Sequence, residues 1–325
     1  MAYVAVTGGC GFIGRETVEA VATRGAGPVL VVDDGSTGRE PPPEHVARWI
    51  RVDIRHPSLP ALFREYGVSA VIHLAARAAV TAYGPEAVEA EGVNVAGTLA
   101  VLEACRTGGV RRLVLASSAA VYGEPDRLPV GEETPLRPKS AYGASKVAAE
   151  AYACAYGAAT SMQIIAFRPA TVYGPGQRPR LEGAACSVFA SALVHGQSGT
   201  IFGDGAQSRD FVYVRDVAEA FAAASLGGPP GTYNLGTGRE TSIRELYSRL
   251  ALAARMPDQP QFGPARPGDI RRSVLDPSAA RRALGWEPRV TLEEGLGATV
   301  RWLRGSEVRG ETSVAAEKPP LLGRR

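Results

Sequence analysis

Cysteine and histidine are scarce in this chain, with four of each among its 325 residues. The cysteines are scattered and form neither a CxxC pair nor a metal-ligand spacing; they are Cys10, Cys105, Cys154 and Cys186. This scarcity argues against a disulfide framework and against structural zinc, so we predict no metal site. A chain without disulfides suits a reducing compartment, and we expect a cytoplasmic protein.

Long apolar runs and blocks of charge are also missing. No run reaches the about 20 apolar residues that a membrane-spanning helix needs, and the N-terminal residues lack the features of a secretion signal. We therefore expect no membrane partner. The 36 basic and 33 acidic residues are spread along the whole chain and leave a formal net charge of +3. Without a basic block or interleaved aromatic residues, nothing predicts binding to nucleic acid.

Short β-rich runs alternate with longer helical patterns in the first half of the chain. The expected strands are Tyr3–Val6, Val29–Val32, Trp49–Val52, Ala70–Leu74, Leu113–Ala116 and Gln163–Phe167. The expected helices are Phe12–Arg24, Leu59–Tyr66, about 86–106 and Ala141–Tyr156. Such alternation predicts an α/β protein with a doubly wound parallel sheet and right-handed crossovers.

Beyond Arg168 the pattern loosens into loops rich in glycine and proline. Shorter elements are expected there: a strand at Phe211–Val214, a helix from Asp216, a strand at Thr232–Asn234 and a helix near Ser242–Ala254. We predict a nucleotide-binding domain at 1–168, to which a segment at about 211–240 returns, and a smaller C-terminal substrate-binding lobe at 169–303. Residues 304–325 show no apolar period and are expected to be a disordered tail.

The first expected strand runs directly into a glycine-rich turn that opens a helix. Gly8, Gly11 and Gly14 form a GxxGxxG arrangement. Glycines permit a tight turn and a close approach of the backbone to a pyrophosphate, which then lies at the positive end of the helix. Phe12 and Ile13 stand inside the motif, where they are expected mainly to pack. The arrangement predicts a dinucleotide site.

Asp33 ends the second expected strand, nineteen residues after Gly14. A carboxylate there accepts hydrogen bonds from both ribose hydroxyls of an adenosine and repels a 2′-phosphate, which favours NAD over NADP. Asp34 is the alternative if the strand register slips by one residue. Asp53, at the end of the third strand, either reaches the adenine edge or caps its own strand.

Tyr142 and Lys146 lie four residues apart and project from one face of an expected helix. Ionising a tyrosine near pH 7 requires roughly 4 kcal/mol of differential stabilisation, because its ordinary pKa is about 10. A neighbouring ammonium is one source of that stabilisation. The pair alone also fits a solvated helix surface, so its interpretation depends on the surrounding motifs.

Those motifs occur in the order seen in the extended short-chain dehydrogenases/reductases. Besides the residues above, they are Asp53–Arg55, His73–Ala76, Asn94–Thr98, Ser117–Gly123, Arg168–Pro169, Val172–Pro175, Gly203–Phe211, Asn234–Gly238 and Arg266–Asp269. Over residues 1–303 the chain resembles the NAD-dependent nucleotide-sugar epimerase/dehydratase family, closest in kind to UDP-hexose 4-epimerases. The resemblance implies a Rossmann-type fold, bound NAD, a UDP-sugar substrate and a homodimer formed by helices near 94–106 and 141–156.

The resemblance also assigns roles to residues. Ser118 would hydrogen-bond the substrate hydroxyl, Tyr142 would remove its proton, and Lys146 would hold the nicotinamide ribose and lower the tyrosine pKa. Asn94 would order the backbone near the cofactor. The implied cofactor contacts are Gly8, Gly11, Phe12, Ile13, Gly14, Asp33, Asp53, Ile54, Ala75, Tyr142 and Lys146. The implied substrate contacts are Ser117, Ser118, Thr171, Arg178, Arg209, Arg266, Asp269 and Ser273.

The substrate residues divide by task. Arg209 and Arg266 match the pair that grips the nucleotide diphosphate, a task suited to planar guanidinium groups, and Asp269 would bind the nucleoside ribose. Ser273 is small where a bulky residue narrows the sugar pocket, as in members that accept N-acetyl sugars, although a plain exposed serine explains it nearly as well. Ser117 either contacts substrate or satisfies backbone at its strand end.

The positions after Ser118 narrow the reaction. Family members that eliminate water usually carry an acidic pair there, whereas this chain has Ala119 and Ala120, which transfer no proton. A further carboxylate typical of decarboxylating members is missing too. Simple 4-epimerisation through a 4-keto sugar, with transient hydride transfer to NAD, needs the fewest groups. We predict an NAD-dependent 4-epimerase of UDP-hexoses or UDP-N-acetylhexosamines, with dTDP left open as the nucleotide.

Two alternatives remain open. Thr171 and Arg178 resemble the residues with which UDP-glucuronate 4-epimerases meet the sugar carboxylate, although Ala119, Ala120 and Arg180 depart from that pattern. A non-catalytic NAD-binding regulator belongs to a different class, and it would be expected to have lost the tyrosine or the lysine.

Overall fold

A seven-stranded parallel sheet forms the centre of the computed structural model, which describes residues 2–36, 42–43, 45–78, 84–179, 185–266 and 268–308. The strand order is β11-β6-β5-β4-β1-β2-β3, and every neighbouring pair is parallel. Their bounds are β1 Tyr3–Thr7, β2 Val29–Asp33, β3 Ala47–Arg51, β4 Val68–His73, β5 Arg112–Ala116, β6 Gln163–Pro169 and β11 Gly231–Leu235. The doubly wound Rossmann-type sheet that the sequence predicts is confirmed.

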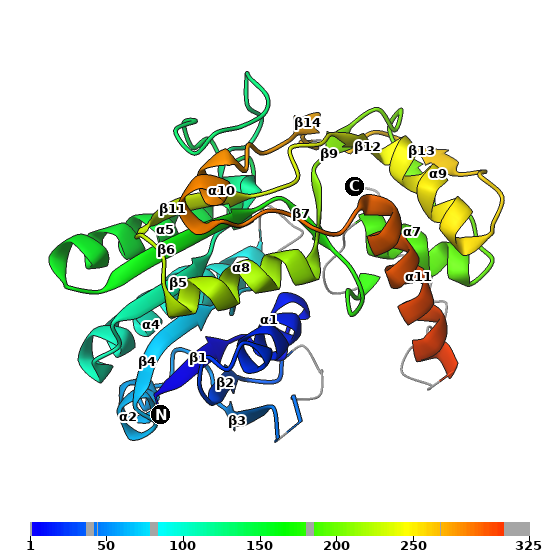
Figure 1. Ribbon diagram of the computed structural model, residues 1–325. Helices are drawn as coiled ribbons and strands as arrows, with labels where there is room; N and C mark the ends of the chain where they lie inside the picture. Colours follow the sequence, from blue (N-terminus) through cyan, green and yellow to red (C-terminus); the bar gives the residue numbers. More distant parts are fainter. Residues whose placement is uncertain are drawn as a thin grey trace.

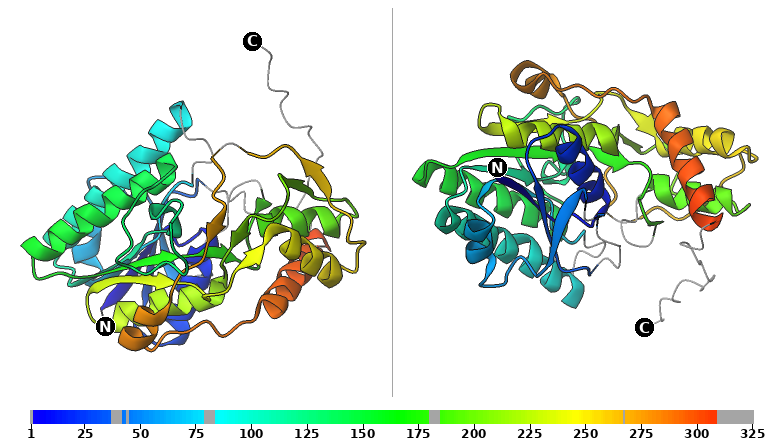
Figure 2. Two further views of the ribbon diagram at one scale, coloured as in Figure 1. Left: turned by 90° about the horizontal axis from the view of Figure 1, so that it is seen from above. Right: turned by 60° about the horizontal axis from the view of Figure 1, so that its bottom comes forward.

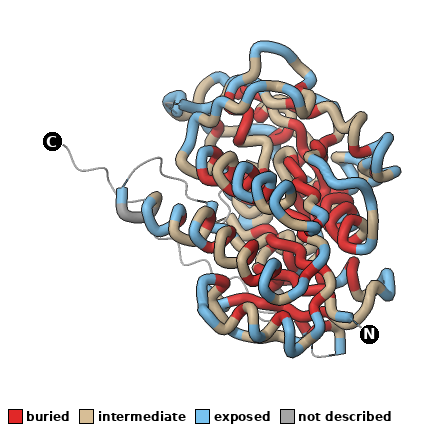
Figure 3. The backbone as a smooth tube through the Cα atoms, turned by 90° about the vertical axis from the view of Figure 1, so that its left-hand side faces the viewer, coloured by how far each residue is buried: buried red, intermediate tan, exposed pale blue. Residues whose placement is uncertain are grey.

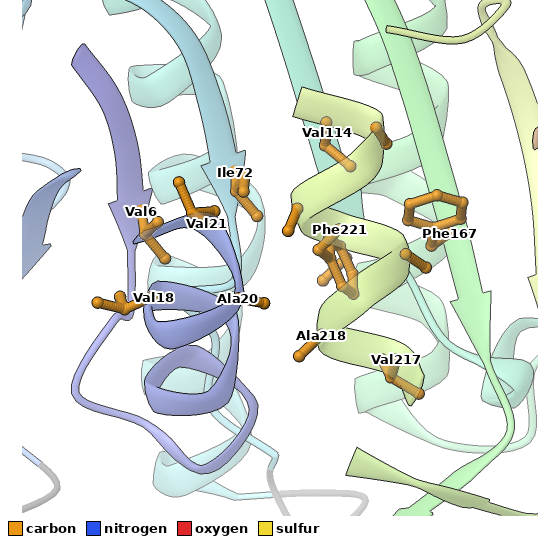
Figure 4. Packing of buried hydrophobic residues seen from close by; sticks show 14 of the residues in the cluster. Val6, Val18, Ala20, Val21, Ile72, Val114, Phe167, Val217, Ala218 and Phe221 are labelled. Atoms are coloured by element: carbon orange, nitrogen blue, oxygen red, sulfur yellow. The ribbon is translucent and has the colours of Figure 1, made fainter. Parts of the chain in front are cut away.

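Helices cover both faces of this sheet (Figure 1). On one face α1 (Phe12–Thr23) and α8 (Val214–Leu226) pack side by side, with Val18, Val21 and Phe221 directed into the core (Figure 4). On the other face lie α2 (Leu59–Glu65), α4 (Gly97–Gly108) and α5 (Ala141–Ala159). Because both faces are covered, central strands such as β2 are buried at every position, which explains their continuous apolar runs.

The chain reverses its direction of travel across the sheet between β1 and β4. From β1 it proceeds to β2 and β3 on one side, and from β4 it proceeds to β5 and β6 on the other. The loops that follow β1 and β4 therefore diverge and leave a crevice at the carboxyl ends of the strands, where such sheets bind their ligands. This crevice places the candidate site.

The later part of the chain builds a second cluster of helices beside the sheet. Three helices pack around a shared apolar core: α7 (Ala185–Val194), α9 (Ile243–Ala254) and α11 (Leu292–Val308). Short strands surround them: β7 Thr171–Tyr173 with β10 Phe211–Tyr213, β8 Thr200–Phe202 with β13 Gln261–Gly263, and β9 Ser208–Arg209 between β12 Thr241–Ser242 and β14 Arg272–Ser273. Between β14 and α11 in the chain, α10 (Ser278–Leu284) packs against β11 of the main sheet. In Figure 3 the buried backbone follows the interior of both parts.

Several elements differ from their predicted bounds. The helix expected at about 86–106 is interrupted: α3 spans Pro85–Glu91, a π-helical turn spans Gly92–Ala96, and α4 follows. Figure 2 shows this broken helix running beside the longer α5. The edge strand β3 begins two residues earlier than Trp49, and α8 begins two residues before Asp216.

Helices α7, α10 and α11 are additions that the sequence patterns did not predict. Because α11 continues to Val308, residues 304–308 are helical and not part of a disordered tail, while residues 309–325 lie outside the described part of the chain. Across the described residues, no helix is both long and apolar enough to span a membrane.

Candidate active site

The turn between β1 and α1 is built so that only glycine fits at two of its positions. Gly8 has a φ of +72°, and a Cβ there would lie 2.6 Å from the main-chain nitrogen of Ala75. A Cβ on Gly14 would lie 2.1 Å from the carbonyl oxygen of Gly8. The backbone consequently turns tightly onto the first turn of α1, whose free N–H groups and helix dipole favour a bound phosphate.

Asp33 ends β2 beside this turn and is held in one orientation. Its Oδ2 accepts a hydrogen bond from the main-chain N–H of Cys10 at 3.0 Å, and its Oδ1 accepts one from Gly35 at 2.8 Å. Asp33 is buried, whereas Asp34 is exposed and caps its own turn at Ser36. The strand register thus points Asp33, the predicted residue, into the site.

A pocket at this edge gathers residues from the loops after β1, β2, β3 and β4. The predicted cofactor residues that line it are Gly8, Gly11, Asp33, Asp53, Ile54 and Ala75. The carboxylate of Asp53 already binds the Arg55 side chain and main-chain N–H, and the Arg55 hydrogen bond lowers the pKa of that carboxyl. Ile13 packs against the core and Phe12 is buried with its ring beside Gly176, so neither side chain lines this pocket, and the cofactor contact of both stays a prediction.

The candidate catalytic residues meet where α5 crosses the end of β5. Ser140 caps α5 by accepting a hydrogen bond from the Gly143 N–H at 3.0 Å. The Nζ of Lys146 donates to the carbonyl oxygen of Ala116 at 2.8 Å and lies 5.7 Å from the ring centroid of Tyr142. The hydroxyl of Ser118 accepts a hydrogen bond from the Ala120 N–H at 3.2 Å and lies close enough to Tyr142 to act on its pKa. The three residues that the sequence singles out are therefore adjacent.

Burial dominates the electrostatics of this group. It raises the pKa of Tyr142 above its ordinary value, and the Ser118 hydroxyl opposes that rise. It also lowers the pKa of Lys146 to about 8, opposed by the negative charge of Glu150. The sequence predicts a lowered pKa for Tyr142. The residues of this site alone do not lower it, because the effect of burial outweighs the effect of Ser118.

The sequence patterns predict little about the contacts of two polar residues behind the site. Asn94, in the π-helical turn, accepts a hydrogen bond from the Arg77 N–H at 2.8 Å and donates to the Arg77 carbonyl at 2.9 Å and to the Ser145 hydroxyl at 3.0 Å. It ties the loop after β4 to α5. His73 is fully enclosed between the hydroxyls of Thr7 and Thr98, and burial lowers its pKa to about 3, so the imidazole is neutral.

Ser117 has a buried partner that the sequence did not reveal. Its hydroxyl donates to the Glu150 carboxylate, which also receives two hydrogen bonds from Arg168. The direct substrate contact predicted for Ser117 is therefore replaced, in our interpretation, by a supporting role. Glu150 stands four residues after Lys146 on α5, and that spacing was the signal that could have drawn attention to it.

A second pocket opens between α7, β8, β9 and the segment before β14. Four of the predicted substrate residues line it: Thr171, Arg209, Arg266 and Asp269. Arg209 and Asp269 form a salt bridge of 2.6 Å, and the Arg266 guanidinium lies 4.0 Å from the ring centroid of Phe202. Two guanidinium groups at one pocket suit a diphosphate.

Two further predicted residues lie outside this lining. Ser273 is half-buried on β14, where it pairs with Arg209 on β9. Arg178 is half-buried in the loop after β7. Among the described residues, no group of three or more histidine, cysteine, aspartate or glutamate side chains could hold a metal ion.

Known proteins that resemble this chain agree in their family. Residues 4–236 match the model of the NAD dependent epimerase/dehydratase family. A UDP-glucose 4-epimerase of Mycolicibacterium smegmatis is 41% identical, with coverage of 92% of this chain and 97% of that protein. The similarity includes residues far beyond the glycine turn.

Solved structures of UDP-glucose 4-epimerases share the fold of this chain. The UDP-glucose 4-epimerase of Thermotoga maritima with UDP-glucose has a TM-score of 0.89 at 34% identity. The UDP-glucose 4-epimerase of Thermus thermophilus in complex with NAD has a TM-score of 0.86 at 40% identity. Each alignment covers 94% of this chain and 99% of the other, so the sheet and the second helical cluster are both shared.

Proposed function

This chain belongs to the NAD dependent epimerase/dehydratase family, and from that membership and its site we propose that it is an NAD-dependent UDP-sugar 4-epimerase. It interconverts UDP-hexoses or UDP-N-acetylhexosamines that differ in configuration at C4. The observation that carries the proposal is the Ser118, Tyr142 and Lys146 group at the end of β5, in a chain that also has an NAD-type pocket and a two-arginine pocket.

The residues at the end of β5 handle a proton. When bound, NAD⁺ accepts a hydride from C4 of the sugar and returns it, and its positive charge favours the ionised form of a neighbouring phenol. Tyr142 removes the proton of the C4 hydroxyl while Ser118 holds that hydroxyl by a hydrogen bond. In the return step Tyr142 gives the proton back to the C4 oxygen, so no proton is gained or lost over the cycle. Lys146 supports the tyrosinate by its charge.

The second pocket has a different task, which is to anchor the nucleotide. Arg209 and Arg266 bind the diphosphate, and Asp269 binds the nucleoside ribose. Arg209 is oriented by main-chain acceptors, since its Nη1 donates to the carbonyl oxygens of Ser208 at 2.7 Å and Ile270 at 2.6 Å. A fixed nucleotide lets the keto sugar turn its other face to the cofactor before hydride returns.

The short turn after Ser118 fits epimerisation better than dehydration. Ala119 and Ala120 begin the 3₁₀ turn Ala119–Val121, and their methyl groups cannot transfer protons. Elimination of water needs an additional acid and base at the sugar. Oxidation and re-reduction at a single carbon need no acid or base besides Tyr142, and these two alanines therefore support the simpler reaction.

We also propose that the protein is a cytoplasmic homodimer that uses the face of α3 and α5. A groove between these helices is lined by Val88 and Tyr152, whose exposed fractions are 69% and 42%. Large apolar side chains exposed along two neighbouring helices favour contact with a second apolar surface. Sedimentation velocity with Val88→Glu and Tyr152→Glu variants tests this assembly, and a monomeric wild-type protein would contradict it.

The substrate is tested directly with purified protein and no added cofactor. Separate incubations with UDP-glucose, UDP-N-acetylglucosamine and UDP-glucuronate are followed by NMR of the anomeric protons. We expect a new C4 epimer from at least one of the first two. Turnover of UDP-glucuronate alone would move the assignment to the uronate epimerases, and no epimer from any of the three would refute the proposal.

A further inference from the structure

Three successive turns of α5 contact three consecutive residues at the end of β5. Tyr142 lies beside the Ser118 hydroxyl, the Lys146 ammonium donates to the Ala116 carbonyl oxygen, and the Glu150 carboxylate accepts a hydrogen bond from the hydroxyl of Ser117. Residues four apart on a helix share one face, so the three side chains form a single row along the helix. In the proposed reaction Tyr142 and Lys146 each have a task, whereas Glu150 has none.

Glu150 is held rigidly by a buried arginine. The Arg168 Nε donates to its Oε1 at 2.9 Å and the Nη2 donates to its Oε2 at 2.6 Å. Both side chains are less than a tenth exposed. A bidentate, charge-assisted pair of this kind fixes the orientation of the carboxylate.

The arginine is fixed in turn from its other side. Its Nη1 donates to the Tyr122 hydroxyl at 2.8 Å and to the Glu132 carbonyl at 3.0 Å. The Tyr122 hydroxyl donates to the Asn234 side chain at 2.7 Å. Glu150 thereby connects α5 to β6 and β11. The connection lies beneath Ser117.

Glu150 also favours the charged form of Lys146. Burial lowers the pKa of the lysine, and the negative charge of Glu150 acts against this. The other ionisable groups facing Lys146 are the Tyr142 phenol and the neutral His73 imidazole, with the Arg168 guanidinium behind Glu150.

Neighbouring elements add no competing charge. The turns Gly92–Ala96 and Ala119–Val121 contain no ionisable side chain. On the adjacent helices, Glu89 pairs with Arg77 and Glu103 pairs with Arg106.

We infer that Glu150 is a positioning residue of the reaction: it fixes Ser117 beneath Ser118 and retains the positive charge of Lys146. The kinetic part of this inference depends on the proposed function, whereas the charge part concerns the folded protein alone. The two parts can therefore be tested separately.

The charge part can be measured without turnover, because the chain contains just three lysines: Lys139, Lys146 and Lys318. The NMR spectrum of the NAD-bound protein with ¹³C-labelled lysine contains few lysine signals. A Lys146→Arg variant identifies the signal of Lys146, because that signal disappears. In Glu150→Gln we expect the midpoint of the Lys146 titration to fall by about one pH unit or more, because a nearby opposite charge shifts a pKa by about 1 to 3. The Lys139 midpoint should not move.

Glu103→Gln is the matched control, since Glu103 also contacts α5, through the Tyr156 hydroxyl, but is exposed. It should leave the Lys146 midpoint in place. If Glu150→Gln does not fold, Glu150→Gln/Arg168→Met removes both buried charges together. A smaller fall in the same direction is expected there. A Lys146 midpoint equal to that of the wild type in the folded variant overturns the charge part.

The positioning part is tested by Ser117→Ala, which keeps both charges. We expect kcat to fall roughly 10- to 100-fold, as for a small misplacement of catalytic groups, with KM, NAD content and the Lys146 midpoint unchanged. Wild-type kcat in Ser117→Ala overturns this part. If the wild-type protein epimerises none of the UDP-sugars, the proposed function fails, while the lysine titration still decides the role of Glu150.

Discussion

Gly143 lies so close to Ala120 that a Cβ on this glycine would come 2.6 Å from the Ala120 carbonyl oxygen. The contact joins the residue after Tyr142 to the turn after Ser118. Its closeness sets the distance between α5 and the end of β5, and therefore the distance between the candidate base and the hydroxyl that assists it.

Replacing Gly143 by alanine should separate these two elements. A displacement of this kind lowers kcat by about two orders of magnitude when it misplaces reacting groups. Gly157→Ala is the matched control on the same helix, because its Cβ would make an ordinary contact of 3.5 Å with Ile164. Steady-state kinetics of both variants check the prediction, and equal kcat values would contradict it.

Cofactor choice should depend on Asp33 and not on Asp34. Asp33→Asn removes the charge that faces the adenosine ribose, so the preference for NAD over NADP should shrink by roughly tenfold or more, as for loss of a hydrogen bond to a charged group. Asp34→Asn is the control, since that side chain is exposed. Isothermal titration of both cofactors into protein freed of nucleotide measures the ratio, and a larger effect at Asp34 would reverse the assignment.

The pH dependence should follow the buried lysine. Its pKa is lowered to about 8, so the ammonium is present below that value and is lost as the pH rises through it. Because the ammonium stabilises the ionised form of Tyr142, kcat should decline above about pH 8. Wild-type kcat measured from pH 6 to 10 tests this, and a rate that keeps rising to pH 10 would show that the ammonium is not required.

The sequence predicted those parts of the fold that local pattern determines. Strands buried on both faces, such as β2, gave continuous apolar runs and correct positions. The edge strand β3 is largely unburied, so its apolar pattern is weak and the predicted start at Trp49 is two residues too late. The π-helical turn at Gly92–Ala96 was missed because helical periodicity does not reveal one extra residue per turn.

The site was predicted to the extent that its residues lie in local motifs. Asp33 ends a strand, Ser118 caps the turn after a strand, and Lys146 lies near the start of a helix, so nearby residues set the geometry of each. Glu150 was not predicted, because its role depends on Arg168, eighteen residues away on β6, and on burial that no local pattern encodes. Tertiary contact also explains why the Tyr142 pKa is raised here.

In the proposed reaction Tyr142 exchanges the proton of the C4 hydroxyl. Tyr142→Phe keeps the ring beside Lys146 and removes only the hydroxyl. Single-turnover formation of the C4 epimer from the UDP-sugar that the wild type converts, with affinity for UDP measured in parallel, tests the claim. We predict that epimer formation falls by at least about 10³-fold while UDP affinity stays within a few-fold; epimerisation at a near-wild-type rate would contradict it.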